Sequence, residues 1–146
     1  MADSARRNQV VTAVVDRLKT VLVTDGYQTN LGNNVFRWRT TPLGPNEVPG
    51  CIVRDTSRRV TYEYSDSARD YEMTVEVVGV ALHGDAADAN LDLVADDIFK
   101  AMLEGDRTLS GIVNDVTPDS DEKVFDQQAQ RIGAVLVRFK VRYRVT

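Results

Sequence analysis

The residues that could perform acid–base chemistry centre on the single histidine of the chain. His83 is followed directly by Gly84 and Asp85. At a junction between a strand and a helix, this arrangement could hold an imidazole general base beside an orienting carboxylate. The alternative is structural, with His83 ending a strand and Asp85 capping the helix that follows. We favour the structural alternative and predict that the protein is not an enzyme.

Other residues with chemical potential are also better explained structurally. Cys51 has no histidine nearby in the sequence and follows Gly50 into an apolar segment, so we expect a buried thiol. The sequence contains no nucleophile elbow, phosphate-binding glycine loop, zinc-ligand spacing or dinucleotide fingerprint. We therefore predict no catalytic residue, no cofactor and no metal.

A cluster of aspartates raises the question of a cation site. Its members are Asp85, Asp88, Asp92, Asp96 and Asp97. Asp88, Asp92 and Asp96 are four positions apart, which places them side by side on one face of a helix. No neighbouring segment supplies the encircling oxygen ligands of a calcium loop. A solvated acidic stripe is the favoured interpretation.

The last segment of the chain alternates strictly between apolar and basic residues. Such alternation predicts a β-strand with one apolar face and one cationic face. The apolar positions are Val135, Val137, Phe139, Val141, Tyr143 and Val145. The basic positions are Arg138, Lys140, Arg142 and Arg144. This basic column must meet acidic neighbours, a partner protein or a polyanion.

Three interpretations of the basic column are possible. Glu72 and Glu76 could lie opposite it as cross-strand partners, which would neutralise two of its four charges. Together with the acidic stripe it could instead form a head-to-tail interface, which closes into rings. A nucleic-acid-binding module is the third alternative, disfavoured by the net charge of −4.

Length and composition indicate one soluble domain spanning residues 1–146. Of the residues, 42% are hydrophobic and 27% charged, as in ordinary globular proteins. A lone cysteine rules out a disulfide framework within the chain and fits a reducing compartment. We see no signal-peptide core and no stretch of membrane-spanning length, so we expect a cytosolic protein without a membrane partner.

Periodicity and turn residues predict an α+β fold. We expect an antiparallel or mixed β-sheet with two α-helices on one face and a projecting β-arm or long loop. The predicted helices cover residues 4–23 and 85–104, and the predicted strands cover 35–39, 51–56, 71–82, 112–116, 124–130 and 135–146. A one-residue shift of the apolar phase beside Gly79 predicts a β-bulge. Residues 118–122 read as an acidic loop, and Phe36 and Trp38 as core.

The segment 58–70 is the predicted arm. Its strand-like residues precede a polar tip at residues 65–67, and little in it is apolar enough to be buried. With the acidic stripe and the basic column it supplies the candidate interface residues. From the arm these are Arg58, Arg59, Tyr62 and Tyr64.

Several short motifs resemble the tail terminator, or tail completion, proteins of long-tailed bacteriophages. They are Gly26-Tyr-Gln-Thr-Asn-Leu-Gly32, the strand Val35-Phe-Arg-Trp-Arg39, a proline loop ending Val48-Pro49, and the helix Leu91–Leu103 followed by Asp106-Arg-Thr-Leu-Ser-Gly111. Ser110 stands where the family usually has the first glycine of a pair. The similarity spans nearly the whole chain but involves no catalytic signature.

The resemblance implies a structural virion protein. Members assemble as a hexameric ring on the finished tail tube, end its polymerisation and join it to the head and neck. The expected partners are therefore copies of the same chain, the tail tube protein and a head or neck connector. The expected location is the phage tail, and the host cytoplasm during assembly. Another tail or neck protein is the alternative within this class.

Overall fold

A computed structural model describes residues 3–82, 87–124 and 132–146. Short 3-10 helices, η1 (Val23–Asp25), η2 (Leu31–Asn33) and η3 (Pro45–Glu47), punctuate the connections. The longer elements in chain order are α1 (Asp3–Leu18), β1 (Val35–Arg37), β2 (Gly50–Ser65), β3 (Ala68–Leu82), α2 (Ala87–Leu103), β4 (Asp115–Val124) and β5 (Ile132–Val145).

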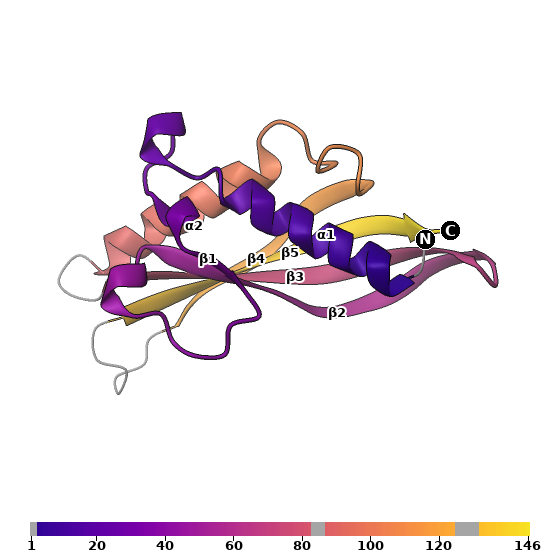
Figure 1. Ribbon diagram of the computed structural model, residues 1–146, viewed down its shortest axis with the longest axis horizontal. Coiled ribbons are helices and arrows are strands. Elements are labelled where there is room, and N and C mark those ends of the chain that lie inside the picture. Colours follow the sequence, from indigo (N-terminus) through magenta and orange to yellow (C-terminus); the bar gives the residue numbers. More distant parts are fainter. Residues whose placement is uncertain (1–2, 83–86, 125–131) are drawn as a thin grey trace.

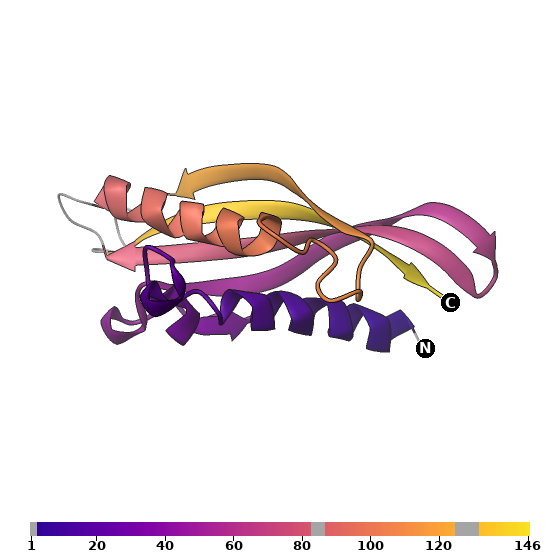
Figure 2. The same ribbon diagram turned by 90° about the horizontal axis from the view of Figure 1, so that it is seen from above.

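The described strands form one mixed sheet in the order β1-β2-β3-β5-β4 (Figure 1). Short β1 pairs with β2 in parallel, and the remaining pairs are antiparallel. α1 and α2 lie on the same side of the sheet (Figure 2). The predicted α+β fold with two helices on one face is confirmed.

The core lies between the two helices and the sheet. Every second residue of β5 from Val135 to Val145 is buried there, as the alternation predicts. On β3 the odd-numbered residues from Tyr71 to Val77 face the same core. The helices contribute Val10, Val11, Val14 and Leu18 from α1, and Leu91, Val94, Ala95, Ile98 and Met102 from α2. All five predicted residues of the α2 stripe are therefore in place.

The predicted β-bulge beside Gly79 is wrong. β3 pairs with β5 in unbroken register from Arg69 to Leu82. Val78 and Val80 are apolar because they pack in a second cluster on the opposite face of the sheet, with Ile52 and Leu43. The strand is thus buried on both faces at this end, and burial on both faces removes the alternation that marks a one-sided strand.

The arm is a β-hairpin that continues the sheet. β2 runs without interruption from Gly50 to Ser65 and joins β3 through a turn at Asp66–Ser67. Its tip projects past the ends of the other strands (Figures 1 and 2). The register between β2 and β3 shifts three times, once just before the arm and twice within it. The projecting arm is confirmed, but it is not separated from the preceding strand as predicted.

Two other element predictions need correction, and a third falls largely outside the described residues. α1 ends at Leu18 rather than near residue 23. A turn follows, in which the Thr20 hydroxyl donates a hydrogen bond to the Arg17 carbonyl at 2.6 Å. Residues 118–122 belong to β4 instead of forming an acidic loop. β4 is an edge strand, where a proline such as Pro118 and a row of polar side chains are tolerated. The strand expected at 124–130 falls largely outside the described residues.

The turn after α2 has an unusual backbone. Leu109, Ser110 and Gly111 have consecutive positive φ values of 51°, 62° and 85°. The Asp106 carboxylate accepts hydrogen bonds from the Thr108 and Ser110 amides at 2.8 and 3.0 Å. A left-handed conformation costs a non-glycine residue about 1–2 kcal/mol. The position where the resembling family has glycine is therefore strained by its serine.

Ser110→Gly should stabilise the protein. Relief of the left-handed strain exceeds the extra freedom that glycine gives the unfolded chain, so we expect a gain of about 0.5–1 kcal/mol. Urea unfolding midpoints measure this change. The matched control is Ser57→Gly, at a strand position of ordinary φ, which should lower stability. Equal destabilisation by both variants would contradict the strain at Ser110.

Candidate interface

The basic column lies on the sheet face opposite the helices and is paired within the subunit. Arg138 Nε lies 3.2 Å from a Glu76 oxygen, and Arg142 Nε lies 3.3 Å from Glu72. Arg144 Nε lies 2.8 Å from Asp70. β3 and β5 bring these partners together because their register places each base directly opposite its acid.

β2 contributes bases to the same network from the other side of β3. Arg54 reaches Glu76 at 3.0 Å and Arg59 reaches Glu72 at 3.3 Å, so each glutamate holds two arginines. Burial alone would raise the pKa of Glu72, but Arg142 and Arg59 lower it below its ordinary value. The Glu72 carboxylate is therefore charged at neutral pH.

The remaining member of the column has a neutral partner. Lys140 Nζ donates to Thr74 Oγ1 at 2.7 Å. Sequence analysis found the acids for Arg138 and Arg142 but missed Asp70, which serves Arg144. The hydrogen bond from Arg144 lowers the pKa of Asp70, and a second one from Tyr64 adds to this effect. Intramolecular pairing thus accounts for most of the basic column.

Arg142→Glu should destabilise the fold rather than act only on assembly. The new carboxylate would lie opposite Glu72, and since Arg142 is largely exposed we expect a modest loss of about 1 kcal/mol. Thermal unfolding measures it. Reversing Asp92 or Asp96 on α2 should not restore the loss. Lys19→Glu, the same charge change at an exposed turn residue just after α1, should have little effect. Rescue by the α2 reversals would contradict intramolecular pairing.

Arg58 does not project from the arm. Its side chain links the start of the arm to the first residue of α1, Asp3. Its guanidinium binds both Asp3 oxygens, at 2.5 and 2.7 Å, and donates to the Tyr143 hydroxyl at 3.0 Å. The same guanidinium lies 4.1 Å from the Tyr71 ring centre, and the Tyr71 hydroxyl donates to Asp3. The Arg58 hydrogen bond lowers the pKa of Asp3. Arg58 therefore has a structural role within the subunit.

The outer half of the arm presents aromatic side chains to solvent. Tyr62 is 60% exposed and Tyr64 49%, with ring centres 4.6 Å apart. The Tyr64 hydroxyl donates to Asp70 at 2.7 Å and receives a hydrogen bond from Arg144 at 2.6 Å. Nearby Val60 is 47% exposed. Exposed aromatics are enriched in the cores of protein interfaces, so this half of the arm is the strongest contact candidate.

The acidic stripe of α2 is exposed, as predicted, and partly neutralised. Lys123 of β4 binds both Asp88 and Asp92, the latter at 2.7 Å. Asp96 is exposed and has no ion-pair partner among the described residues. Asp97 differs from the others, since it is buried and accepts hydrogen bonds from the Gln28 and Thr29 amides at 3.0 and 2.7 Å. It anchors a loop and does not belong to a cation site.

Trp38 is not in the core, contrary to expectation. β1 ends at Arg37, and a φ of 52° at Trp38 turns the side chain out of the strand alternation, leaving it 48% exposed. Its indole N–H donates to Asp55 at 2.7 Å. Phe36 does pack against the second apolar cluster. The alternation of residues 35–39 gave no indication that the strand would end after three residues.

No alternative chemistry gains support from the described residues. His83, Gly84 and Asp85 lie outside them. Cys51 is fully buried, and burial raises the pKa of its thiol to about 12. Within the described part of the chain no group of three potential ligands is placed to hold a metal ion. No helix there is long and apolar enough to cross a membrane.

Comparison with known proteins adds no family assignment. No protein-family model matches the chain, and no curated protein matches it.

Proposed function

We propose that the protein is a structural subunit of a long-tailed bacteriophage, forming a ring that caps the tail tube. In this role it ends tube polymerisation and joins the tail to head and neck proteins. It acts through shape and charge, without catalysis or a cofactor. Its location would be the virion tail, after assembly in the host cytoplasm.

The observation that carries the proposal is the projecting hairpin with exposed Val60, Tyr62 and Tyr64. A monomer gains nothing from holding large apolar side chains on an arm beyond its own core. The arm fits a protein whose working state places a neighbour against it. The α+β fold and the motifs described above agree with the tail terminator class, while a tube or connector protein is the alternative within it.

The nucleic-acid alternative is less favoured. Three of the four bases in the column have carboxylate partners on neighbouring strands. Counterion release requires cations free to neutralise phosphates, so a paired column contributes little to it. Affinity for DNA that falls steeply with salt would favour this alternative instead.

The proposal is tested by adding the protein to tail tube protein that is polymerising. Tube lengths are measured by electron microscopy. We expect tubes to shorten as the protein is added, with extra density at one end only. Tubes of unchanged length without end density would contradict a terminator role. Binding along the sides of the tubes, or incorporation throughout them, would favour the alternative of another tail protein.

A further inference from the structure

Lys140 differs from the other described bases on the face of the sheet opposite the helices. Each of those bases forms an ion pair with a carboxylate of β3; they are Arg54, Arg59, Arg138, Arg142 and Arg144. Lys140 is half-buried, and its ammonium donates to Thr74 Oγ1 at 2.7 Å but forms no ion pair with a described residue. Cations that are partly removed from water are normally paired, so Lys140 is available to a new anion.

Hydroxyl groups lie beside the Lys140 ammonium. Thr74 is directly opposite on β3 and only 9% exposed. Its oxygen accepts the hydrogen bond from Lys140, and its own proton has no acceptor among the described residues. Ser57, the neighbour of Thr74 on β2, has a hydroxyl that makes no hydrogen bond to a described residue. The row therefore offers several hydrogen-bond donors to an outside acceptor.

A small recess lies over this row. Its volume is about 90 Å³, and its lining residues are Ser57, Arg58, Arg59, Glu72, Thr74 and Lys140. Pockets for whole small molecules usually measure roughly 300–1,000 Å³. The recess can therefore hold a single functional group. That group must accept hydrogen bonds, because ammonium, hydroxyl and guanidinium groups supply most of the lining.

The surrounding acids favour a group with one negative charge. Glu72 lines the recess, and Asp115 and Asp119 lie on β4, which adjoins β5. None of the three forms an ion pair with Lys140, but together they weaken the positive potential around it. A doubly charged phosphate group would be repelled by them. A carboxylate carries one charge and two acceptor oxygens, which suits one ammonium and its neighbouring hydroxyls.

We propose that the Lys140 site, formed by Ser57, Thr74 and Lys140, binds the carboxylate of an acidic side chain on a protein partner. Lys140 forms the ion pair, and the two hydroxyls donate to the carboxylate oxygens. A free small acid has too few atoms to bind such a recess tightly, so a larger partner presents the group.

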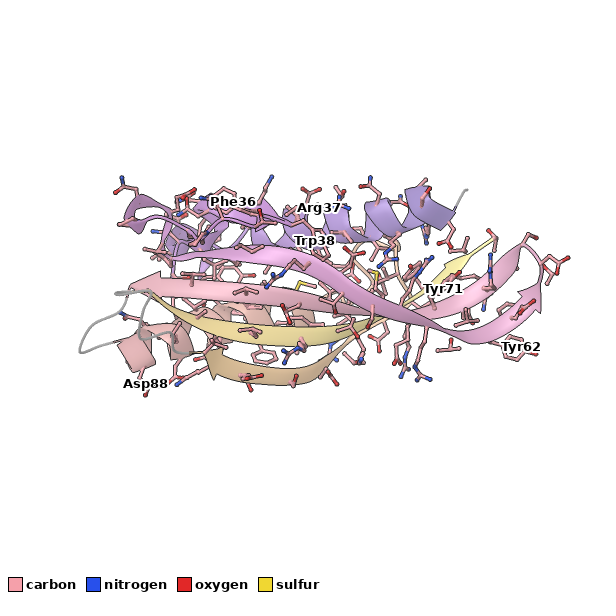
Figure 3. All side chains as sticks on the ribbon, turned by 90° about the horizontal axis from the view of Figure 1, so that it is seen from below. Phe36, Arg37, Trp38, Tyr62, Tyr71 and Asp88 are labelled. Atoms are coloured by element: carbon pink, nitrogen blue, oxygen red, sulfur yellow. The ribbon has the colours of Figure 1, made fainter. Side chains whose placement is uncertain are left out.

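This face of the sheet is open to such a partner. Both helices lie on the other side (Figure 2), and in Figure 3, which views the molecule from below, the strands lie in front of α2. The side chains of Arg59 and Arg142 beside the site are 72% and 57% exposed. The inference rests on the proposed function only in taking the partner to be a protein of the tail.

Titration of the full chain with sodium acetate, followed by NMR, tests the site without a partner. At constant ionic strength we expect saturable shifts of the Thr74 amide signal, with a dissociation constant on the order of 1–10 mM. Lys140→Gln should abolish saturation, and Thr74→Val should weaken binding at least about 10-fold. Inorganic phosphate at neutral pH should bind more weakly than acetate. Lys19→Gln, at an exposed turn lysine, is the matched control and should bind acetate normally.

The same variants test the protein partner. Lys140→Gln should leave the melting temperature unchanged, whereas Arg138→Gln breaks ion pairs with Glu76 and Glu122 and should lower it. In the tube assay, Lys140→Gln should require at least roughly 10-fold more protein to shorten the tubes. Lys140→Arg keeps the charge and should be closer to the wild type.

Each outcome supports or overturns the proposal. Absence of saturable shifts with acetate would overturn the site. Tighter binding of phosphate than of acetate would overturn the carboxylate assignment. If Lys140→Gln loses acetate binding but shortens tubes as well as the wild type, the ligand is a free acid and the partner's carboxylate is overturned. Wild-type protein that binds acetate but leaves tube lengths unchanged would support the site and contradict the proposed terminator function.

Discussion

Replacing both Tyr62 and Tyr64 by alanine is expected to abolish assembly of the purified protein. The two rings supply most of the exposed apolar surface of the outer arm. Anchors of this kind contribute about 2 kcal/mol or more to an interface, so the contact should weaken by at least roughly 30-fold. A ring uses the same contact at every subunit, which multiplies the effect. Light scattering across concentration measures the loss of oligomers.

Two controls separate assembly from folding. Val23→Ala, at an exposed apolar residue outside the arm, should leave assembly unchanged. Tyr64→Phe keeps the ring that packs on Tyr62 but removes the hydroxyl bound to Asp70 and Arg144. It should therefore retain most of the assembly. If the double alanine variant still forms rings of normal mass, the arm is not the contact.

A large effect on folding is expected at Gly79. A Cβ atom there would lie 2.5 Å from Val94 Cγ1, 3.0 Å from Ile98 Cδ1 and 3.1 Å from Val135 Cγ1. Glycine thus allows α2 to pack directly against β3. Gly79→Ala should cost about 1–3 kcal/mol through overpacking, and Gly79→Val should cost more. For a domain of this size, that lowers the melting temperature by several degrees or more.

The clash at position 79 can be relieved from the α2 side. The atom nearest to the added Cβ is Val94 Cγ1. Val94→Ala in the Gly79→Ala background should restore part of the stability, because it removes the closest clash. Gly44→Ala is the control, since its nearest neighbour would be a flexible Glu47 oxygen at 3.5 Å. Additive losses in the Gly79→Ala, Val94→Ala double variant would contradict direct packing between the two residues.

The local sequence pattern predicted the shape of the arm but not all of its contacts. Its polar tip and strand-like residues predicted a projecting hairpin arm or long loop, and a hairpin is present. The role of Arg58 could not be predicted, because the side chain binds Asp3, which is far away in sequence. Likewise, Trp38 alternates like a core residue, but the end of β1 is set by pairing that lasts only from Val35 to Arg37.

Strong periodicity was enough to predict the terminal strand, the buried stripe of α2 and the α+β class. In each, one side of a regular backbone had to be apolar, and that requirement is local. The partners of the basic column depend on the tertiary structure. Alternation assigns a side chain to a face, but the register of β3 against β5 decides that Arg144 meets Asp70 and Lys140 meets Thr74. Register depends on both strands and on the core that packs beneath them.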